Sequence, residues 1–444
     1  MTGERERGAR AERSAADDCE VLIVGGGLVG LTLGVALASA GIETVVVDRE
    51  APARTRGEAF DGRASAIARG PQQALAALGI WPTLAARAQP ILEIRVSDGQ
   101  VGRPASPLFL HYDRAEVDGL PLGYMVENRD IRSALHAAVA SGVARQGRLR
   151  LIAPARVEQV ERGPVWAEAR LTDLPAGGGA RLRARLVVAA DGPSSPLRRA
   201  AGIPVTAWEY RQAGLVATVA HERPHHGVAH EHFLPSGPLA MLPLLDGPDA
   251  LERATGRPVH RSSIVWTERP ELAAALLRLD DDGFAAELTR RFGDSLGRLA
   301  LIGRRWSYPL ALSYARRVVD HRLALLGDAA HRIHPIAGQG LNLGLRDVAA
   351  LAEVIVEAQR LGLDPGAPQA LARYARWRRL DNLMLIAVTD GLNRLFSNDQ
   401  PALRLVRDLG LAAVDRMPLA KRFFMRHAMG LVGDLPRLLE GRAL

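Results

Sequence analysis

The chain has 444 residues, 48% of them hydrophobic and 24% charged, and its formal net charge is +8 at pH 7. This composition is typical of a globular protein. The chain is longer than a domain with a single hydrophobic core usually is, so we expect at least two domains. All but one of the basic residues are arginines spread along the chain, with no basic cluster beside aromatic residues, which argues against a nucleic-acid-binding protein.

The first 18 residues mix acids and arginines without an apolar core, so we expect a disordered tail and not a targeting signal. The single cysteine, Cys19, excludes an intrachain disulfide and a cysteine-based metal site, and is typical of a reducing compartment. No run of about 18 consecutive apolar residues is present, so no segment is predicted to cross a membrane. We therefore expect a cytoplasmic protein, and attraction to an anionic membrane surface stays open.

The first predicted elements form a nucleotide-binding unit. An apolar strand at 21–24 leads into Gly25, Gly27 and Gly30 and a helix, and a second apolar strand ends at Asp48. Glycines allow a tight turn and let backbone N–H groups approach a pyrophosphate at the positive end of the helix. The acid lies 18 residues after the last glycine, where it can accept hydrogen bonds from ribose hydroxyls. The motif predicts a dinucleotide but does not separate NAD from FAD.

Stretches of a different character interrupt this unit. "ILEIRVSDG" and the segment from about Trp208 to Trp306 alternate or contain Pro and Gly, as antiparallel strands do. We predict an α/β fold in which a Rossmann-like nucleotide-binding domain is interrupted by an antiparallel-sheet substrate domain and followed by a C-terminal helical segment. The predicted limits are 1–18 for the tail, 19–95, 125–205 and 306–365 for the nucleotide-binding domain, 96–124 and 206–305 for the sheet domain, and 366–444 for the helices.

The histidines of "HERPHHGVAHEHF" are the one candidate metal site. His230 and His232 would share a face of a strand. Because no known carboxylate–histidine spacing accompanies them, we predict no metal. His331 and His334 are interpreted as loop and cofactor-pocket residues.

The segment that decides the cofactor is Arg322 to Leu351, "RLALLGDAAHRIHPIAGQGLNLGLRDVAAL". It is typical of a strand that ends at Gly327 and Asp328, a loop, and a helix that begins near Gly340. The segment resembles the Gly-Asp box of the class A flavoprotein aromatic hydroxylases, which have the para-hydroxybenzoate hydroxylase fold. The form "HPIAGQGLNLGLRD" is most similar to the ubiquinone-biosynthesis hydroxylase family. The resemblance runs from about Val21 to "LFSND" and implies FAD.

The resemblance also implies roles for individual residues. Asp328 would bond the ribityl chain of FAD, and the loop before the helix would direct N–H groups at the flavin pyrimidine ring, where reduced flavin carries negative charge. Asp191, in "RLVVAADGPSS", would serve both FAD and reduced nicotinamide, and Asp48 replaces the glutamate that these flavoproteins more often carry. Local matches such as "FDGRASAIA" and "GYMVENRDIRSAL" supply arginines near FAD. The candidate FAD-binding residues are Gly25, Gly27, Gly30, Asp48, Arg49, Arg63, Arg129, Val157, Asp191, Gly192, Gly327, Asp328, Pro335, Gly338, Gln339, Gly340, Leu341 and Asn342.

The activity that the resemblance implies is FAD-dependent hydroxylation of the aromatic ring of a polyprenylated phenol in ubiquinone biosynthesis. The oxygen would pass through a flavin C4a-hydroperoxide, with O2 and NADPH, NADH or a protein electron donor as co-reactants. Two alternatives stay open, a hydroxylase of a small soluble aromatic and a non-catalytic FAD-binding subunit of a biosynthetic complex. The sequence names no catalytic acid or base. Implied partners are the phenol and O2, with other ubiquinone-pathway enzymes and the inner membrane face left open.

The C-terminal stretch from Leu403 to Leu439 carries apolar residues at helical spacing, with arginines and Lys421 interleaved. Pro418 and Gly433 break it into pieces. We interpret it as helices that either cap the flavin domain or meet a membrane or a partner enzyme.

Overall fold

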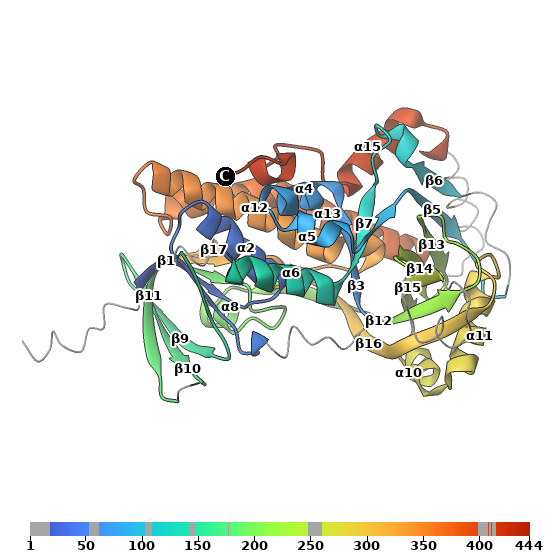
Figure 1. Cartoon of the computed structure of the whole chain (residues 1–444), viewed down its shortest axis with the longest axis horizontal. Coiled ribbons are helices and arrows are strands. Elements are labelled where there is room, and N and C mark those ends of the chain that lie inside the picture. The colour runs from blue at the N-terminus through green and yellow to red at the C-terminus, as the bar shows by residue number, and fades with distance from the viewer. Residues whose placement is uncertain are drawn as a thin grey trace, which may run out of the picture.

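The structure is a computed structural model that describes residues 18–52, 62–102, 109–141, 148–175, 177–246, 260–397, 407, 410 and 414–444. Of the predicted tail it describes only Asp18, which begins the first strand, and the expectation for 1–17 lies outside the described residues. The described residues form two large sheets, one at each end of the molecule, with long helices running between them (Figure 1).

The first sheet is the nucleotide-binding one. Its strands and covering helices are β1 (Asp18–Val24), β2 (Thr44–Val47), β8 (Leu149–Ile152), β9 (Arg156–Arg162), β10 (Ala167–Thr172), β11 (Ala180–Ala189), β17 (Val319–Asp320), β18 (Leu323–Leu325), α2 (Leu28–Ser39), α6 (Asn128–Ala140) and α12 (Gln339–Arg360). The order is β17-β18-β11-β1-β2-β8, parallel from β18 to β8, with β9 and β10 attached to β11. One core cluster unites Leu33 of α2, Leu135 of α6 and Ile355 of α12. Residues of β1 alternate between this cluster, which contains Val21 and Ile23, and a second cluster beside β9 and β10, which contains Leu22 and Val24. Because both faces of the sheet are covered, β1 and β2 are nearly continuous apolar runs.

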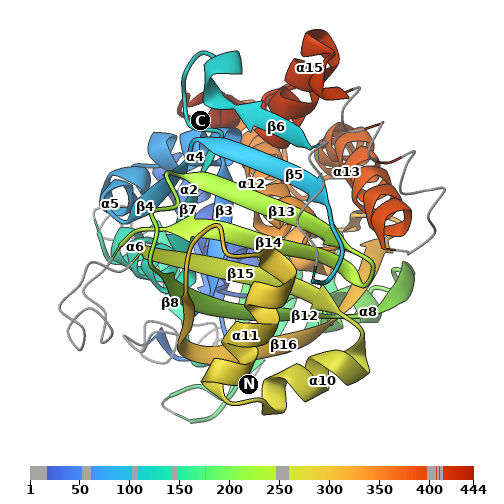
Figure 2. The ribbon, with the colours of Figure 1, turned by 90° about the vertical axis from the view of Figure 1, so that its right-hand side faces the viewer.

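The second sheet is antiparallel except where β13 pairs with β5. Its members are β5 (Glu93–Asp98), β6 (Leu110–Asp113), β12 (Val205–His221), β13 (Val228–Leu234), β14 (Gly237–Leu244), β15 (His260–Glu268), β16 (Leu299–Ala315) and β19 (His331–Arg332). The order is β19-β16-β12-β15-β14-β13-β5-β6. Helices α10 (Pro270–Arg278) and α11 (Asp281–Phe292) cover its outer face (Figure 2). In β12, Leu215, Ala217 and Val219 pack with that layer, so the alternate residues face the nucleotide domain.

A third, small sheet bridges the two. It contains β3 (Ala64–Ala68), β4 (Ala88–Ile91) and β7 (Gly123–Glu127), in the order β3-β7-β4. The remaining elements are α4 (Arg69–Ala77), α5 (Trp81–Ala85), α8 (Pro196–Ala200), α13 (Pro368–Phe396), α15 (Pro418–Ala428) and the short 3-10 turns η1 (Arg114–Glu116), η2 (Gly327–Ala329), η3 (Ile336–Gly338) and η4 (Arg437–Glu440).

The predicted fold class, an α/β nucleotide domain with a second sheet and C-terminal helices, is confirmed. The domain limits stay a prediction. All but 365/366 fall inside a strand: 18/19 in β1, 95/96 in β5, 124/125 in β7, 205/206 in β12 and 305/306 in β16. Strands β5, β12 and β16 belong to the second sheet throughout their length, because their ladders continue across those positions. Among the described helices, none combines the length and the apolar character needed to span a bilayer.

Candidate active site

The glycine turn after β1 has the tight backbone contacts that its motif predicts. Gly25 has a φ of +112°, and a Cβ there would lie 2.2 Å from the carbonyl oxygen of Ala190. A Cβ on Gly30 would lie 1.9 Å from the carbonyl oxygen of Gly25, so neither position accepts a side chain. At Gly27 a Cβ would meet nothing within 4 Å, although Gly27 precedes α2 and no side chain caps the helix. No protein atom would clash with a side chain at Gly27. A phosphate bound at the helix N-terminus, however, needs the space that a side chain would occupy.

The acid after β2 is held by the same turn. The Asp48 carboxylate accepts hydrogen bonds from the N–H of Gly26 at 2.5 Å and from that of Glu50 at 2.7 Å. Each carboxylate oxygen keeps further acceptor capacity. Arg49 is exposed next to it. Two backbone N–H groups therefore orient the Asp48 carboxylate, which is predicted to contact a ribose.

Two motifs about 300 residues apart in sequence meet here. A Cβ on Gly344 would lie 2.8 Å from Cγ2 of Val29 in α2 and 3.5 Å from Cα of Gly327, which itself has a φ of +58°. Glycines at these positions let α12 and the Gly-Asp turn pack directly on α2. The helix that follows the nucleotide turn and the Gly-Asp box thus pack directly against each other.

Asp328 itself makes no hydrogen bond to another described residue, and its side chain is open to solvent. The surrounding protein nevertheless removes enough water to raise the pKa of the Asp328 carboxyl, against the charges of His331 and Arg332, which lower it. The carboxylate therefore keeps contact with solvent although protein atoms surround much of it. It is available for a hydroxylated ligand.

The loop before α12 ends at a helix N-terminus. Gly338 is the N-cap residue, has a φ of +62° and supplies no side-chain hydrogen bond to the helix. Pro335, Gln339, Gly340 and Leu341 are half-buried around this point. Asn342 is different, because its amide is committed to β3: it accepts from the N–H of Ala68 at 2.9 Å and donates to the carbonyl of Ala66 at 2.9 Å. Its predicted contribution to FAD binding is therefore the positioning of the loop.

The remaining predicted residues lie in three places. Asp191 and Gly192 adjoin the glycine turn, since a Cβ on Gly25 would lie 3.0 Å from the Asp191 nitrogen, and burial raises the pKa of Asp191 in spite of hydrogen bonds from Ser195 and Leu197. Arg63 and Arg129 lie beside β3 and β7. The Arg63 guanidinium lies 5.6 Å from the centre of the Trp306 ring, and Arg129 Nε lies 2.7 Å from Oε2 of Glu127. Val157 on β9 packs against the core of the first sheet, in the cluster that also holds Val24, Val47 and Ala329, and its role at the cofactor stays a prediction.

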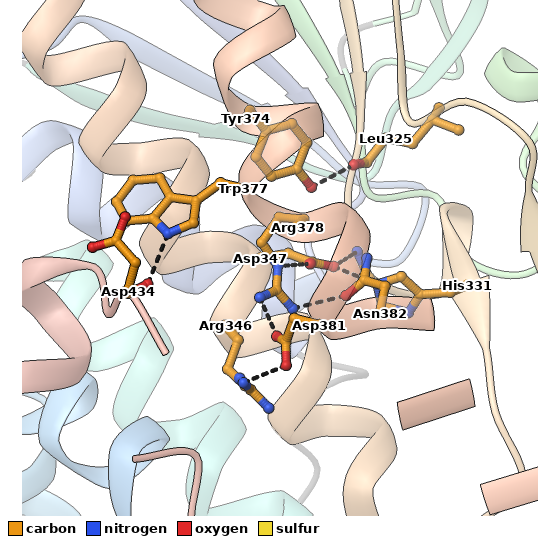
Figure 3. Close-up of polar contacts among 11 residues, drawn as sticks. Leu325, His331, Arg346, Asp347, Tyr374, Trp377, Arg378, Asp381, Asn382 and Asp434 are labelled. Atoms are coloured by element: carbon orange, nitrogen blue, oxygen red, sulfur yellow. Dashed lines mark hydrogen bonds and ion pairs between the residues drawn. The ribbon is translucent and has the colours of Figure 1, made fainter. Parts of the chain in front are cut away.

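A buried charge network behind the Gly-Asp box is the main feature that the sequence did not predict (Figure 3). Asp347 of α12 accepts from His331 Nε2 at 2.5 Å, from Arg378 Nε of α13 at 2.7 Å and from the N–H of Gly327 at 3.3 Å. Burial would raise the pKa of Asp347, but His331 and Arg378 lower it to about 2. Arg378 also pairs with Asp381, which binds Arg346 at 2.5 Å. The available signal was an Arg-Asp pair inside the apolar run "NLGLRDVAAL".

A second unpredicted feature is the apolar wall beside the loop. Phe233 of β13 and Phe396 of α13 stack with ring centres 4.2 Å apart and pack with Ile336 of η3. His334 is fully buried, its two ring nitrogens have no hydrogen-bond partner, and its ring meets that of Tyr210 edge-on at 5.1 Å. Burial lowers the pKa of His334 to about 4, so the ring is neutral at pH 7. The ring is an uncharged group two residues before Ile336, and its role beside the cofactor stays a prediction.

The described residues contain one three-member grouping with metal-ligand geometry, Glu93, His111 and Asp113. It excludes the histidines that the sequence suggested. Oε2 of Glu93 already binds Arg95 and His111, both at 2.9 Å. The arginine charge at the same oxygen disfavours a cation, and no metal function follows from the grouping.

Comparison with known proteins agrees with this geometry. The chain matches the FAD binding domain family over residues 18–380. It is 52% identical over 434 residues to the ubiquinone hydroxylase UbiL of Rhodospirillum rubrum, covering 96% of this chain and 94% of that protein. The chain belongs to this FAD-binding family of flavoprotein monooxygenases. The resemblance to the ubiquinone-biosynthesis hydroxylases is confirmed.

Other members of the family extend the likeness. The 3-demethoxyubiquinol 3-hydroxylase of Escherichia coli is 34% identical, with 93% of this chain and 98% of that protein covered. The crystal structure of p-nitrophenol 4-monooxygenase from Pseudomonas putida has the same fold, with a TM-score of 0.75 over 94% of this chain and 99% of that one at 21% identity. The protein is an FAD-dependent aromatic-ring monooxygenase, and FAD is its cofactor.

The described residues fit FAD. Three features are suited to FAD: the N-termini of α2 and α12, which no N-cap side chain bonds, the open side of Gly27, and the Asp328 carboxylate, which has no hydrogen-bond partner among the described residues. A helix N-terminus is suited to a pyrophosphate or to an electron-rich ring edge, and the carboxylate to ribityl hydroxyls.

Replacing Asp328 by alanine is expected to weaken FAD binding by about 1.5–3 kcal/mol, or about tenfold to a hundredfold in Kd, because ribityl hydroxyls lose a charged acceptor. Flavin fluorescence during titration of the apoprotein measures this Kd. The exposed Glu168 on β10, replaced by alanine, is the control and should leave the Kd unchanged. An unchanged Kd in Asp328→Ala would remove Asp328 from the site.

Proposed function

We propose that the protein hydroxylates the aromatic ring of a polyprenylated phenol in ubiquinone biosynthesis. The observation that carries this proposal is full-length likeness to proteins named for hydroxylation of ubiquinone precursors, at 52% identity over 96% of the chain for the first of them. The apolar wall of Phe233, Ile336 and Phe396 beside the FAD loop supports it, since a substrate ring without charged substituents matches uncharged surroundings.

The chain's own residues have a positioning task in this function. FAD supplies, when bound, the redox chemistry that activates O2. We propose that Gly25, Gly27, Gly30 and Asp48 hold its nucleotide half and that the other predicted residues hold its ribityl and flavin parts. The neutral His334 and the stacked phenylalanines keep the substrate side free of charge, and such a water-poor pocket suppresses loss of activated oxygen as peroxide.

The co-reactants and the location belong to the same proposal. The electron donor is NADPH or NADH, or a protein that carries those electrons, and O2 is the oxygen source. The protein acts in the cytoplasm at the inner membrane face, beside other enzymes of the pathway. A small soluble aromatic as substrate would make activity independent of lipid or detergent, and a non-catalytic subunit would hold FAD that no donor reduces.

Deleting the gene is expected to abolish one ring hydroxylation and to cause the substrate of that step to accumulate. Mass spectrometry of the lipid extract identifies that compound. A complemented strain with wild-type protein restores ubiquinone, whereas Asp328→Ala restores it weakly. Normal ubiquinone and no accumulated prenylated phenol in the deletion strain would refute the proposal.

A further inference from the structure

The helix α15 lies at the edge of the molecule, beside β6 (Figures 1 and 2). It carries an exposed apolar surface. The exposed fractions are 84% for Leu419, 54% for Phe423, 46% for Phe424 and, just before the helix, 57% for Met417. Phe423 touches the Phe424 and His427 rings and no other described ring. Isolated exposed apolar residues are common in proteins, but four such residues within eight positions form a patch that needs a partner.

The charge of this surface is of one sign. Arg416, Arg422 and Arg426 are exposed, and none of the three forms an ion pair with a described residue. The nearest acids are already engaged, because Asp415 and Glu116 lie 3.0 Å and 2.7 Å from Nζ of Lys421 on the buried side. Unpaired arginines around phenylalanines and leucine match the interface of a bilayer with anionic headgroups.

We propose that this outer face of α15, made of Met417, Leu419, Phe423, Phe424 and the three arginines, docks on an anionic lipid bilayer. The body of the protein does not need this face, because α15 is attached by its opposite side. There Met425 and Met429 are buried, and the N–H of Gly70 donates to the carbonyl of Met429 at 2.9 Å. The helix therefore has a face for the protein and a separate face for lipid.

The inner face of α15 connects this surface with the flavin loop. Met425 and Met429 belong to an apolar cluster with Ala229 and Leu244 of the second sheet, against which Ala66 of β3 packs. A Cβ on Gly338 of the flavin loop would lie 3.1 Å from the Cβ of that same Ala66. Contacts between apolar side chains thus run from the inner face of α15 to the flavin loop. On the proposed function, docking through the outer face of α15 brings this part of the molecule to the bilayer that holds the isoprenoid tail.

The test is sedimentation of the intact FAD-loaded protein with vesicles. We expect it to pellet with vesicles of phosphatidylcholine plus phosphatidylglycerol at low salt, and to bind pure phosphatidylcholine at least about tenfold more weakly, because each arginine near an anionic surface contributes. Phe423→Ser with Phe424→Ser, and separately Arg422→Gln with Arg426→Gln, should each reduce partitioning by about tenfold or more.

The matched control is Leu380→Ser with Leu383→Ser, which removes two exposed apolar side chains from α13 and should leave partitioning within about twofold of wild type. All variants should keep their flavin absorbance. Equal binding to neutral and anionic vesicles, an equal loss in the α13 control, or pelleting without vesicles through an α15-dependent dimer would each overturn the proposal.

The vesicle-binding result does not depend on catalytic turnover. If the protein hydroxylates another substrate, vesicle binding still tests the docking face. If prenylated phenol is the substrate but α15 does not bind lipid, the gene deletion succeeds while the vesicle test fails. When both hold, the phenylalanine variant raises KM for vesicle-borne phenol and leaves kcat for a short-tailed soluble phenol unchanged.

Discussion

Replacing Asp347 by asparagine is expected to lower the free energy of unfolding by about 3–5 kcal/mol, because it leaves a buried arginine with an incomplete counter-charge. The carboxylate is fully enclosed and contacts three groups from three segments: His331, Arg378 and the N–H of Gly327. Asparagine has nearly the same shape but cannot supply the charge. It also presents an amide N–H₂ to one of these donors.

The loss should extend to the cofactor. Gly327 precedes Asp328, so releasing its N–H loosens the turn that presents the ribityl-binding carboxylate. Denaturant unfolding of the apoprotein measures the change in the free energy of unfolding without the cofactor. Flavin titration measures the change in FAD affinity. The control is Glu440→Gln, whose exposed partner is Arg442; surface pairs of this kind contribute about 0–1 kcal/mol. A change below about 1 kcal/mol in Asp347→Asn would show that the network does not support the fold.

The free energy of unfolding is expected to fall steeply between about pH 6.5 and pH 4, because four histidines are neutral when folded. Burial lowers the pKa of His221, His230, His232 and His334 to about 4. Between these pH values the unfolded chain binds protons that the folded chain does not bind. The free energy of unfolding therefore rises with pH and is lost as the pH falls. Each such histidine contributes a slope of about 1.4 kcal/mol per pH unit.

Other groups act against this slope. Burial raises the pKa of Glu268, so the folded protein protonates this group first and gains stability on acidification. Comparing the wild type with a variant isolates the effect of one histidine. Between pH 6.5 and 4, the free energy of unfolding of His334→Leu should change with pH by about 1.4 kcal/mol per pH unit less than that of the wild type. Denaturant titrations at stepped pH measure both slopes. An identical slope in the variant would mean that His334 takes up its proton equally in both states.

The sequence by itself determined the nucleotide motif and the cofactor family. Glycine is required at Gly30 by a backbone contact with Gly25 inside one strand–turn–helix unit, and the residue spacing of such a local unit can be recognised in the sequence. At Gly25 the contact is with Ala190 of a distant segment, which only the tertiary structure shows. The Gly-Asp box was readable for the same reason, since the strand, the turn at Gly327 and the start of α12 are adjacent in the chain. The alternation in β12 likewise predicted a strand with two different faces.

Only the tertiary structure decided which partners those faces meet. Asp347 lies in an apolar helix, and nothing local states that His331 and Arg378 converge on it from another turn and another helix. Asn342 is predicted beside FAD from its motif, and only the structure shows that its amide also binds β3, a strand nearly 280 residues earlier in the sequence. The periodicity of the C-terminal stretch likewise left open which side of α15 is covered. A helical pattern specifies which side chains share a face, whereas the element packed on that face depends on contacts between distant segments.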